Sequence, residues 1–155
     1  METHYYTVDI SWENNRKGIM CSPELNARKG ICIEVATPPE FPKGMEGIWS
    51  PEHLFVASIS GCLMTSFLAI AENSTLEFKS FNCQAKGKLE MVECKLMMSE
   101  ILLKPTVVIY NEVFTNKAIR ILKKAEAACV ITNSMKSKVM MEINILVQPI
   151  LIESK

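Results

Sequence analysis

The sequence predicts an α+β domain in which antiparallel strands surround one long apolar helix. Residues 54–71 carry apolar or small side chains on every face of a helix, which is typical of a buried helix. Strand-like segments lie on both sides of it, and an amphipathic helix follows at 116–128. This alternation favours an α+β fold, and a chain of 155 residues fits a single domain over 1–155.

The N-terminal part predicts a small sheet. Residues 5–12 are rich in aromatic and β-branched side chains, and residues 19–22 are expected to pair back on them as a hairpin. The turn between the two contains Arg16. Residues 31–36 alternate as a strand does, and a loop rich in proline and glycine follows at 37–47. Long loops in compact domains are often functional.

The central helix has clear start signals. Ser50 is a favourable N-cap, Pro51 fits the first helical position, and Glu52 complements the helix dipole. A few strands of one chain cover only one face of such a helix. We therefore expect a homodimer in which two copies of this helix pack together inside a shared shell of sheets.

The remaining elements are two long antiparallel strands, a helix and a last strand. Alternation over 76–89 and 94–110 predicts the strand pair, and 139–147 the last strand. In the helix over 116–128 the apolar residues share one face and the lysines lie opposite.

Composition argues against several classes of function. Lysine plus arginine equal aspartate plus glutamate at 17 each, which does not favour a nucleic-acid or membrane partner. We expect no apolar run of the roughly 18 residues that span a membrane, and no secretory signal. A cytoplasmic protein is the expectation.

The six cysteines are expected to be reduced thiols. No two of them form a CxxC motif and only two histidines are present, so we expect no zinc site. Four of the cysteines are expected to be packing residues in strands: Cys21, Cys32, Cys83 and Cys94.

Glu52 and Cys62 raise a geometric question. Ten positions of helix (52 to 62) span about 15 Å, so the two side chains of one chain cannot touch. If two such helices pack antiparallel about a two-fold axis near Ala57, Glu52 of one chain lies beside Cys62 of the other. A carboxylate raises the pKa of a nearby thiol, so a cation has to intervene, and Arg16 is the candidate.

The segment PEHLFVASISGCL resembles the cysteine-bearing helix of the OsmC/Ohr family of hydroperoxide reductases. EAACVITNSM resembles the segment with their second cysteine, and TPPEF and the arginine-bearing turn match in order. The resemblance implies the OsmC-like fold and an intertwined homodimer with its sites at the interface. It also implies that Cys62 is the peroxidatic cysteine, Cys129 the resolving cysteine, and Glu52 the carboxylate that holds the active-site arginine, for which we choose Arg16.

The implied chemistry uses no metal or organic cofactor. Cys62 reduces an organic hydroperoxide and becomes a sulfenic acid, Cys129 condenses with it to a disulfide, and an external dithiol, of lipoyl type in one branch, reduces that disulfide. Two departures from the family pattern are Val130, where proline often follows the second cysteine, and GIWS before Pro51.

Two other functions stay open. The first is a non-catalytic dimer that binds a small apolar ligand in the interface pocket. The second is acyl transfer by Cys62, for which no histidine is convincingly placed as a base.

Overall fold

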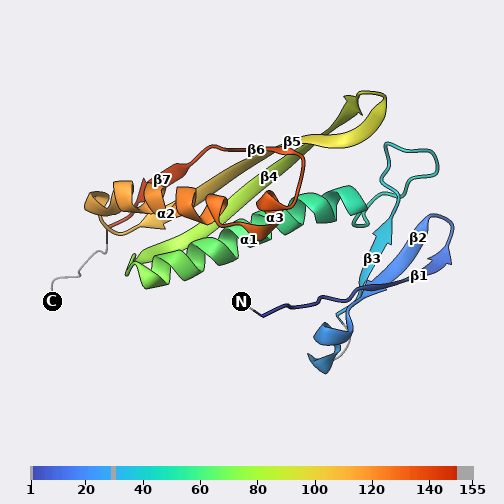
Figure 1. The fold of residues 1–155 in the computed structure, drawn as a ribbon, viewed down its shortest axis with the longest axis horizontal. Helices are drawn as coiled ribbons and strands as arrows, with labels where there is room; N and C mark the ends of the chain where they lie inside the picture. The colour runs from blue at the N-terminus through green and yellow to red at the C-terminus, as the bar shows by residue number, and fades with distance from the viewer. Residues whose placement is uncertain (1, 29–30, 150–155) are drawn as a thin grey trace. The chain divides into compact units, whose positions relative to one another are not determined.

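The computed structural model describes residues 2–28 and 31–149, and the chain divides into two compact units, Met1–Leu54 and Phe55–Lys155. The described residues confirm the α+β class, with antiparallel strand pairs and one long helix (Figure 1). That 1–155 forms a single domain stays a prediction.

The first unit contains a three-stranded antiparallel sheet. Its order is β1 (Asp9–Asn14), β2 (Lys17–Cys21) and β3 (Ile33–Ala36), and a 3₁₀ helix (Pro23–Arg28) follows β2. The expected hairpin is confirmed, although its first strand begins at Asp9 and not at Tyr5. Asn15 has a φ of 46°, which suits the tight turn.

A disulfide joins Cys21 to Cys32, so the expectation of six reduced thiols is wrong for this pair. The register explains the pairing. The β2–β3 ladder ends at Met20 opposite Ile33, so the next positions along both strands are the two cysteines. Their Cα atoms lie 4.5 Å apart, within the usual span of a disulfide. Spacing along the chain does not reveal this contact, because the pairing of β2 with β3 creates it.

Helix α1 (Pro51–Asn73) begins where the capping signals predict. The backbone N–H of His53 donates to the Ser50 hydroxyl at 3.2 Å, which confirms Ser50 as the cap. Within this chain the helix is not buried all round. Its buried residues are spaced four apart on one face: Ile59, Leu63, Phe67 and Ala71. Met64 and Leu68 are 40% and 41% exposed, so an apolar face stays uncovered.

The expectation that no apolar run reaches the length of a membrane span is also wrong. Helix α1 is long and apolar enough by length and composition, and 22% of its most apolar stretch is buried. A core helix of a soluble protein passes the same test, so this helix is weak evidence for a membrane span.

The second unit holds a four-stranded sheet. Strands β4 (Phe78–Val92) and β5 (Lys95–Ile109) form the predicted long hairpin, joined by Glu93 and Cys94 at φ values of 47° and 62°. Two positive φ angles in a two-residue loop are typical of the type I′ turn, whose twist matches that of the two strands it joins.

The expected last strand is two short strands. β6 (Lys138–Met141) and β7 (Asn144–Val147) both pair with β5 in parallel. Parallel pairing follows from the connection, since helix α2 (Thr115–Ala127) and the short helix α3 (Val130–Asn133) cross between β5 and β6. Helix α2 agrees closely with the expected 116–128.

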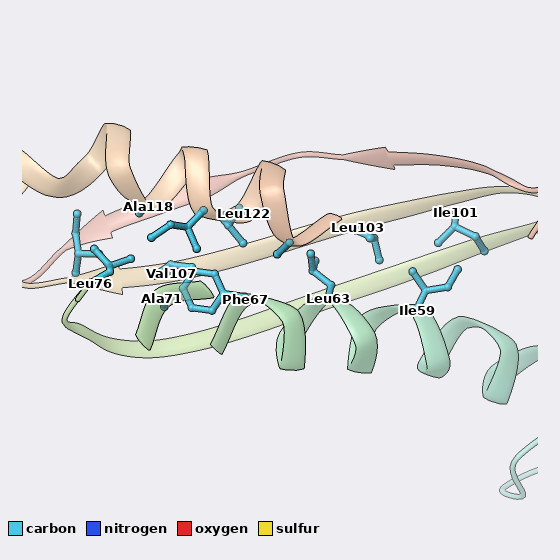
Figure 2. Close-up of a cluster of buried hydrophobic side chains, with 13 residues drawn as sticks. Ile59, Leu63, Phe67, Ala71, Leu76, Ile101, Leu103, Val107, Ala118 and Leu122 are labelled. Carbon is cyan, nitrogen blue, oxygen red and sulfur yellow. The ribbon is translucent and has the colours of Figure 1, made fainter. Parts of the chain in front are cut away.

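The core of this unit lies between its helices and the sheet. Figure 2 shows side chains of α1 and α2 gathered with those of β5 in one cluster. Phe67 is fully buried and contacts the rings of Phe78 and Phe81 at 5.2 and 5.0 Å between centroids. Burying one such side chain contributes about 1.5–3 kcal/mol, so this packing fixes α1 firmly against β4.

Candidate active site

The fold brings Cys62 and Cys129 together, although 67 positions (62 to 129) separate them in the chain. Cys62 lies on α1 beside the buried Leu63, and Cys129 is the N-cap of α3. The Cys129 thiol donates a hydrogen bond to the sulfur of Cys62. Both are free cysteines, so the pair is in its dithiol form.

Cys62 has the features of a nucleophile. Burial raises the pKa of its thiol, but four hydrogen bonds to the sulfur together lower that pKa below the ordinary value. The donors are the Cys129 thiol, the backbone N–H of Ile131, the Ser66 hydroxyl and the backbone N–H of Val130. A thiolate is the nucleophilic form of cysteine, so these donors favour that form of the Cys62 sulfur.

Cys129 is shifted in the opposite direction. Burial, and then its hydrogen bond to Cys62, raise the pKa of the Cys129 thiol, and Thr132 opposes them in part. The backbone N–H of Thr132 donates to the Cys129 sulfur at 3.4 Å. Cys129 is 1% exposed, whereas Cys62 is partly exposed. The pair therefore holds a thiolate-favouring sulfur and a protonated partner in contact.

One of these donors was within reach of sequence reasoning. Ser66 follows Cys62 by four positions, and residues four apart share a helix face. Val130 stands where the resemblance leads us to expect proline, and proline has no N–H to donate. The departure at Val130 thus adds a hydrogen bond to the site. That the amides of Val130 and Ile131 donate to Cys62 was not predictable, because only the fold brings α3 to α1.

Glu52 occupies the first turn of α1, as predicted. Its Oε2 atom is buried, and within residues 2–28 and 31–149 it has no hydrogen-bond partner. A buried carboxylate oxygen without a partner is costly, so it calls for a donor. The neighbouring His53 is engaged elsewhere, because its Nδ1 lies 2.8 Å from the Ser50 hydroxyl.

Arg16 lies in the β1–β2 turn, as predicted. Its backbone carbonyl accepts from the N–H of Thr37 at 3.1 Å, which ties the turn to the end of β3. In the part of the chain that the structure describes, no ion pair joins Arg16 to Glu52. The structure thus unites the two cysteines and leaves this carboxylate and this guanidinium unpaired with each other.

Arg16 borders an open pocket of about 550 Å³ within the first unit. Its apolar walls include Trp12, Val35 and Ala36, and the first two of these residues come from different strands of the sheet. A guanidinium beside an apolar wall suits a ligand that has both a polar and a hydrocarbon part.

The other two thiols contribute nothing to this pair. Burial raises the pKa of Cys83 on β4. Cys94 is exposed in the hairpin turn, so the expectation that it packs within a strand is wrong.

Comparison with known proteins agrees with this fold. Residues 44–144 match the family described as OsmC-like protein. The uncharacterized protein YmaD of Bacillus subtilis (strain 168) is 20% identical over 146 residues, which cover 92% of this chain and 94% of that protein.

Solved structures give the same result. An OsmC-like protein of unknown function from Vibrio cholerae superposes with a TM-score of 0.81 at 23% identity, over 91% of this chain and 99% of that one. An organic hydroperoxide resistance protein OsmC from Legionella pneumophila gives a TM-score of 0.70 at 17% identity, over 95% of this chain and 100% of that one. At such identities the likeness shows the fold alone.

Proposed function

The chain belongs to the OsmC-like protein family, and from that premise we propose that it is a thiol-dependent hydroperoxide reductase. One observation carries the proposal: Cys62 and Cys129 share a hydrogen bond, and their pKa values are shifted in opposite directions. A peroxidase needs a thiolate that attacks and a nearby thiol that resolves. The OsmC protein of Legionella pneumophila, described as an organic hydroperoxide resistance protein, has the same fold.

The proposed reaction balances with two thiols. The Cys62 thiolate attacks the terminal oxygen of an organic hydroperoxide, the O–O bond breaks, and an alcohol leaves after taking a proton. Cys62 becomes a sulfenic acid. The Cys129 sulfur then attacks the Cys62 sulfur, water leaves and a Cys62–Cys129 disulfide forms. An external dithiol reduces this disulfide by exchange and is itself oxidised.

Glu52 is proposed to hold Arg16, and Arg16 is proposed to bind the hydroperoxide substrate. The unpartnered Oε2 atom of Glu52 would accept from a guanidinium, and Arg16 is the candidate donor. A guanidinium held in this way would present its other N–H groups to a peroxide oxygen.

A homodimer is part of the proposal. The uncovered face of α1 around Ala57, which reaches Met64, would pack against the same face of a second copy. The antiparallel arrangement about Ala57 would bring Glu52 of one copy beside Cys62 of the other. Dimer formation would thus complete a site of which one chain supplies only parts.

The decisive experiment is peptide mass spectrometry of fully reduced protein after one equivalent of cumene hydroperoxide. We expect rapid formation of a Cys62–Cys129 disulfide, complete loss of peroxide consumption in Cys62→Ser, and a trapped sulfenic acid in Cys129→Ser. Cys83→Ser is the matched control and should react like the parent protein. Slow, scattered oxidation of all thiols would contradict the proposal.

A non-catalytic ligand-binding function is the second candidate, and the pocket of about 550 Å³ beside Arg16 favours it. It predicts that an apolar probe such as 1-anilinonaphthalene-8-sulfonate binds with equal affinity to the parent protein and to Cys62→Ser, with no peroxide consumed by either. Peroxide turnover that depends on Cys62 would reject it.

A further inference from the structure

The Cys21–Cys32 disulfide stands apart from the thiol pair described above. It lies wholly within the first unit and joins the last residue of β2 to the residue that precedes β3. Eleven positions separate the two cysteines, so the bond closes the connection between these strands. A link across a loop restricts the unfolded chain and stabilises the pairing that it flanks.

The first unit has few other buried contacts to hold this pairing. Among its described residues the buried hydrophobic side chains are Val35 and Ala36, and the large buried cluster of the protein lies in the second unit. Strand β1 is exposed along its whole length, with Trp12 76% exposed. Small units with so little buried apolar surface commonly depend on a covalent link.

The β2–β3 pairing also positions Arg16. The ladder begins at Lys17 opposite Ala36, directly beside the turn, and ends at Met20 opposite Ile33, directly beside the disulfide. The carbonyl of Arg16 and the N–H of Thr37 extend the ladder by one bond. The ammonium of Lys17 contacts Glu34 of β3 at 2.5 Å. Because the ladder is so short, opening the disulfide at one end is expected to loosen the pairing beside Arg16 at the other end.

The disulfide is accessible to a reductant, because Cys32 is exposed and Cys21 is partly exposed. We propose that Cys21 and Cys32 form a second redox site, a disulfide that an external dithiol reduces and re-forms. Its oxidation state determines how firmly β2 and β3 are paired, and with them how well the turn that carries Arg16 is ordered. This site does not depend on the proposed peroxidase activity.

The exchange is balanced. A thiolate of the dithiol attacks the Cys32 sulfur, the Cys21–Cys32 bond breaks, and Cys21 leaves as a thiolate that takes up a proton. The second thiol of the dithiol then releases Cys32 and closes its own disulfide. Two electrons pass from the dithiol to the pair, and the oxidised dithiol reverses the steps.

The test combines two measurements on the full chain, prepared without reductant and then equilibrated with graded ratios of reduced to oxidised dithiothreitol. Quenched alkylation with peptide mass spectrometry measures the fraction of Cys21 and Cys32 that is reduced. Amide hydrogen exchange measures how well the backbone of the strands is protected. We expect Cys21 and Cys32 to resist alkylation without reductant and to become alkylated together as the ratio rises. Over the same interval, amide exchange in 17–21 and 33–36 should accelerate several-fold, while exchange in 95–109 stays unchanged.

Variants sharpen the comparison. Cys21→Ser/Cys32→Ser should show the fast exchange at every ratio, and Cys94→Ser, which removes an exposed free thiol, should behave like the parent protein. If the double variant does not fold, the comparison of amide exchange between the oxidised and reduced parent protein still tests the proposal. Alkylation of Cys21 and Cys32 without reductant would overturn the proposal, and so would equal exchange of the strands in the two states.

Discussion

The thiol of Cys129 donates a hydrogen bond to the sulfur of Cys62, and the bond shifts their two pKa values apart. It stabilises the thiolate of Cys62 and the protonated form of Cys129. The two residues are therefore chemically unequal, although both are free cysteines.

This inequality predicts the pH dependence of alkylation. Because the pKa of Cys62 is lowered, its thiolate fraction rises at a lower pH than that of an ordinary thiol, and alkylation follows the thiolate. Cys83, whose pKa is raised by burial, should begin to react only at higher pH. Iodoacetamide labelling rates from pH 5 to pH 10, resolved by peptide mass spectrometry, give both profiles. Coincident profiles for the two cysteines would contradict the prediction.

Val130→Pro should slow the reaction of Cys62 by removing one N–H donor. The backbone accepts proline here, because Val130 is the first residue of α3 and Cys129 has extended angles of −66° and 111°. A hydrogen bond to a charged group contributes about 1.5–3 kcal/mol, so alkylation at neutral pH should fall roughly tenfold.

The control for this variant is Val130→Ala, which keeps the N–H and should react like the parent protein. Circular dichroism verifies that both variants are folded. An unchanged labelling rate in a folded Val130→Pro variant would show that this amide does not stabilise the thiolate.

Ser66→Ala should raise the pKa of Cys62, because the Ser66 hydroxyl is one of the donors to its sulfur. The alkylation profile should move to higher pH, by less than the sum of all four donors. Ser60→Ala is the matched control, since the Ser60 hydroxyl donates at 3.1 Å to the carbonyl of Ala57 in its own helix. Equal shifts in the two variants would argue for a general effect on α1.

Ala57→Glu should break the proposed dimer. Ala57 is partly exposed within one chain, and a two-fold axis at this residue would bring the two introduced carboxylates together between apolar helices, which is strongly unfavourable. Light scattering after size exclusion should show a dimer for the parent protein and a monomer for the variant. Lys123→Glu, a change on α2, is the control and should stay dimeric. A monomeric parent protein would refute the helix-to-helix dimer directly.

The sequence by itself determined most of the elements and their order, although the predicted last strand is two strands, β6 and β7. Apolar periodicity predicted α2 within one residue of its ends, and Ser50 and Pro51 predicted where α1 begins, because caps and helix faces are local properties. The motif around Cys62 resembled a known family, and the match over residues 44–144 confirmed that family. The positions of Glu52 and Arg16, in a first helical turn and a hairpin turn, were also predictable from local signals.

Only the tertiary structure decided which residues meet. The contact of Cys62 with Cys129, the amides of Val130 and Ile131 at the sulfur, and the Cys21–Cys32 disulfide all join segments that separate elements bring together. The parallel pairing of β6 and β7 with β5 is likewise a contact that only the tertiary structure decides. Local propensity acts over a few residues, whereas these contacts depend on register between strands and on packing of helices, which the one-dimensional pattern does not specify.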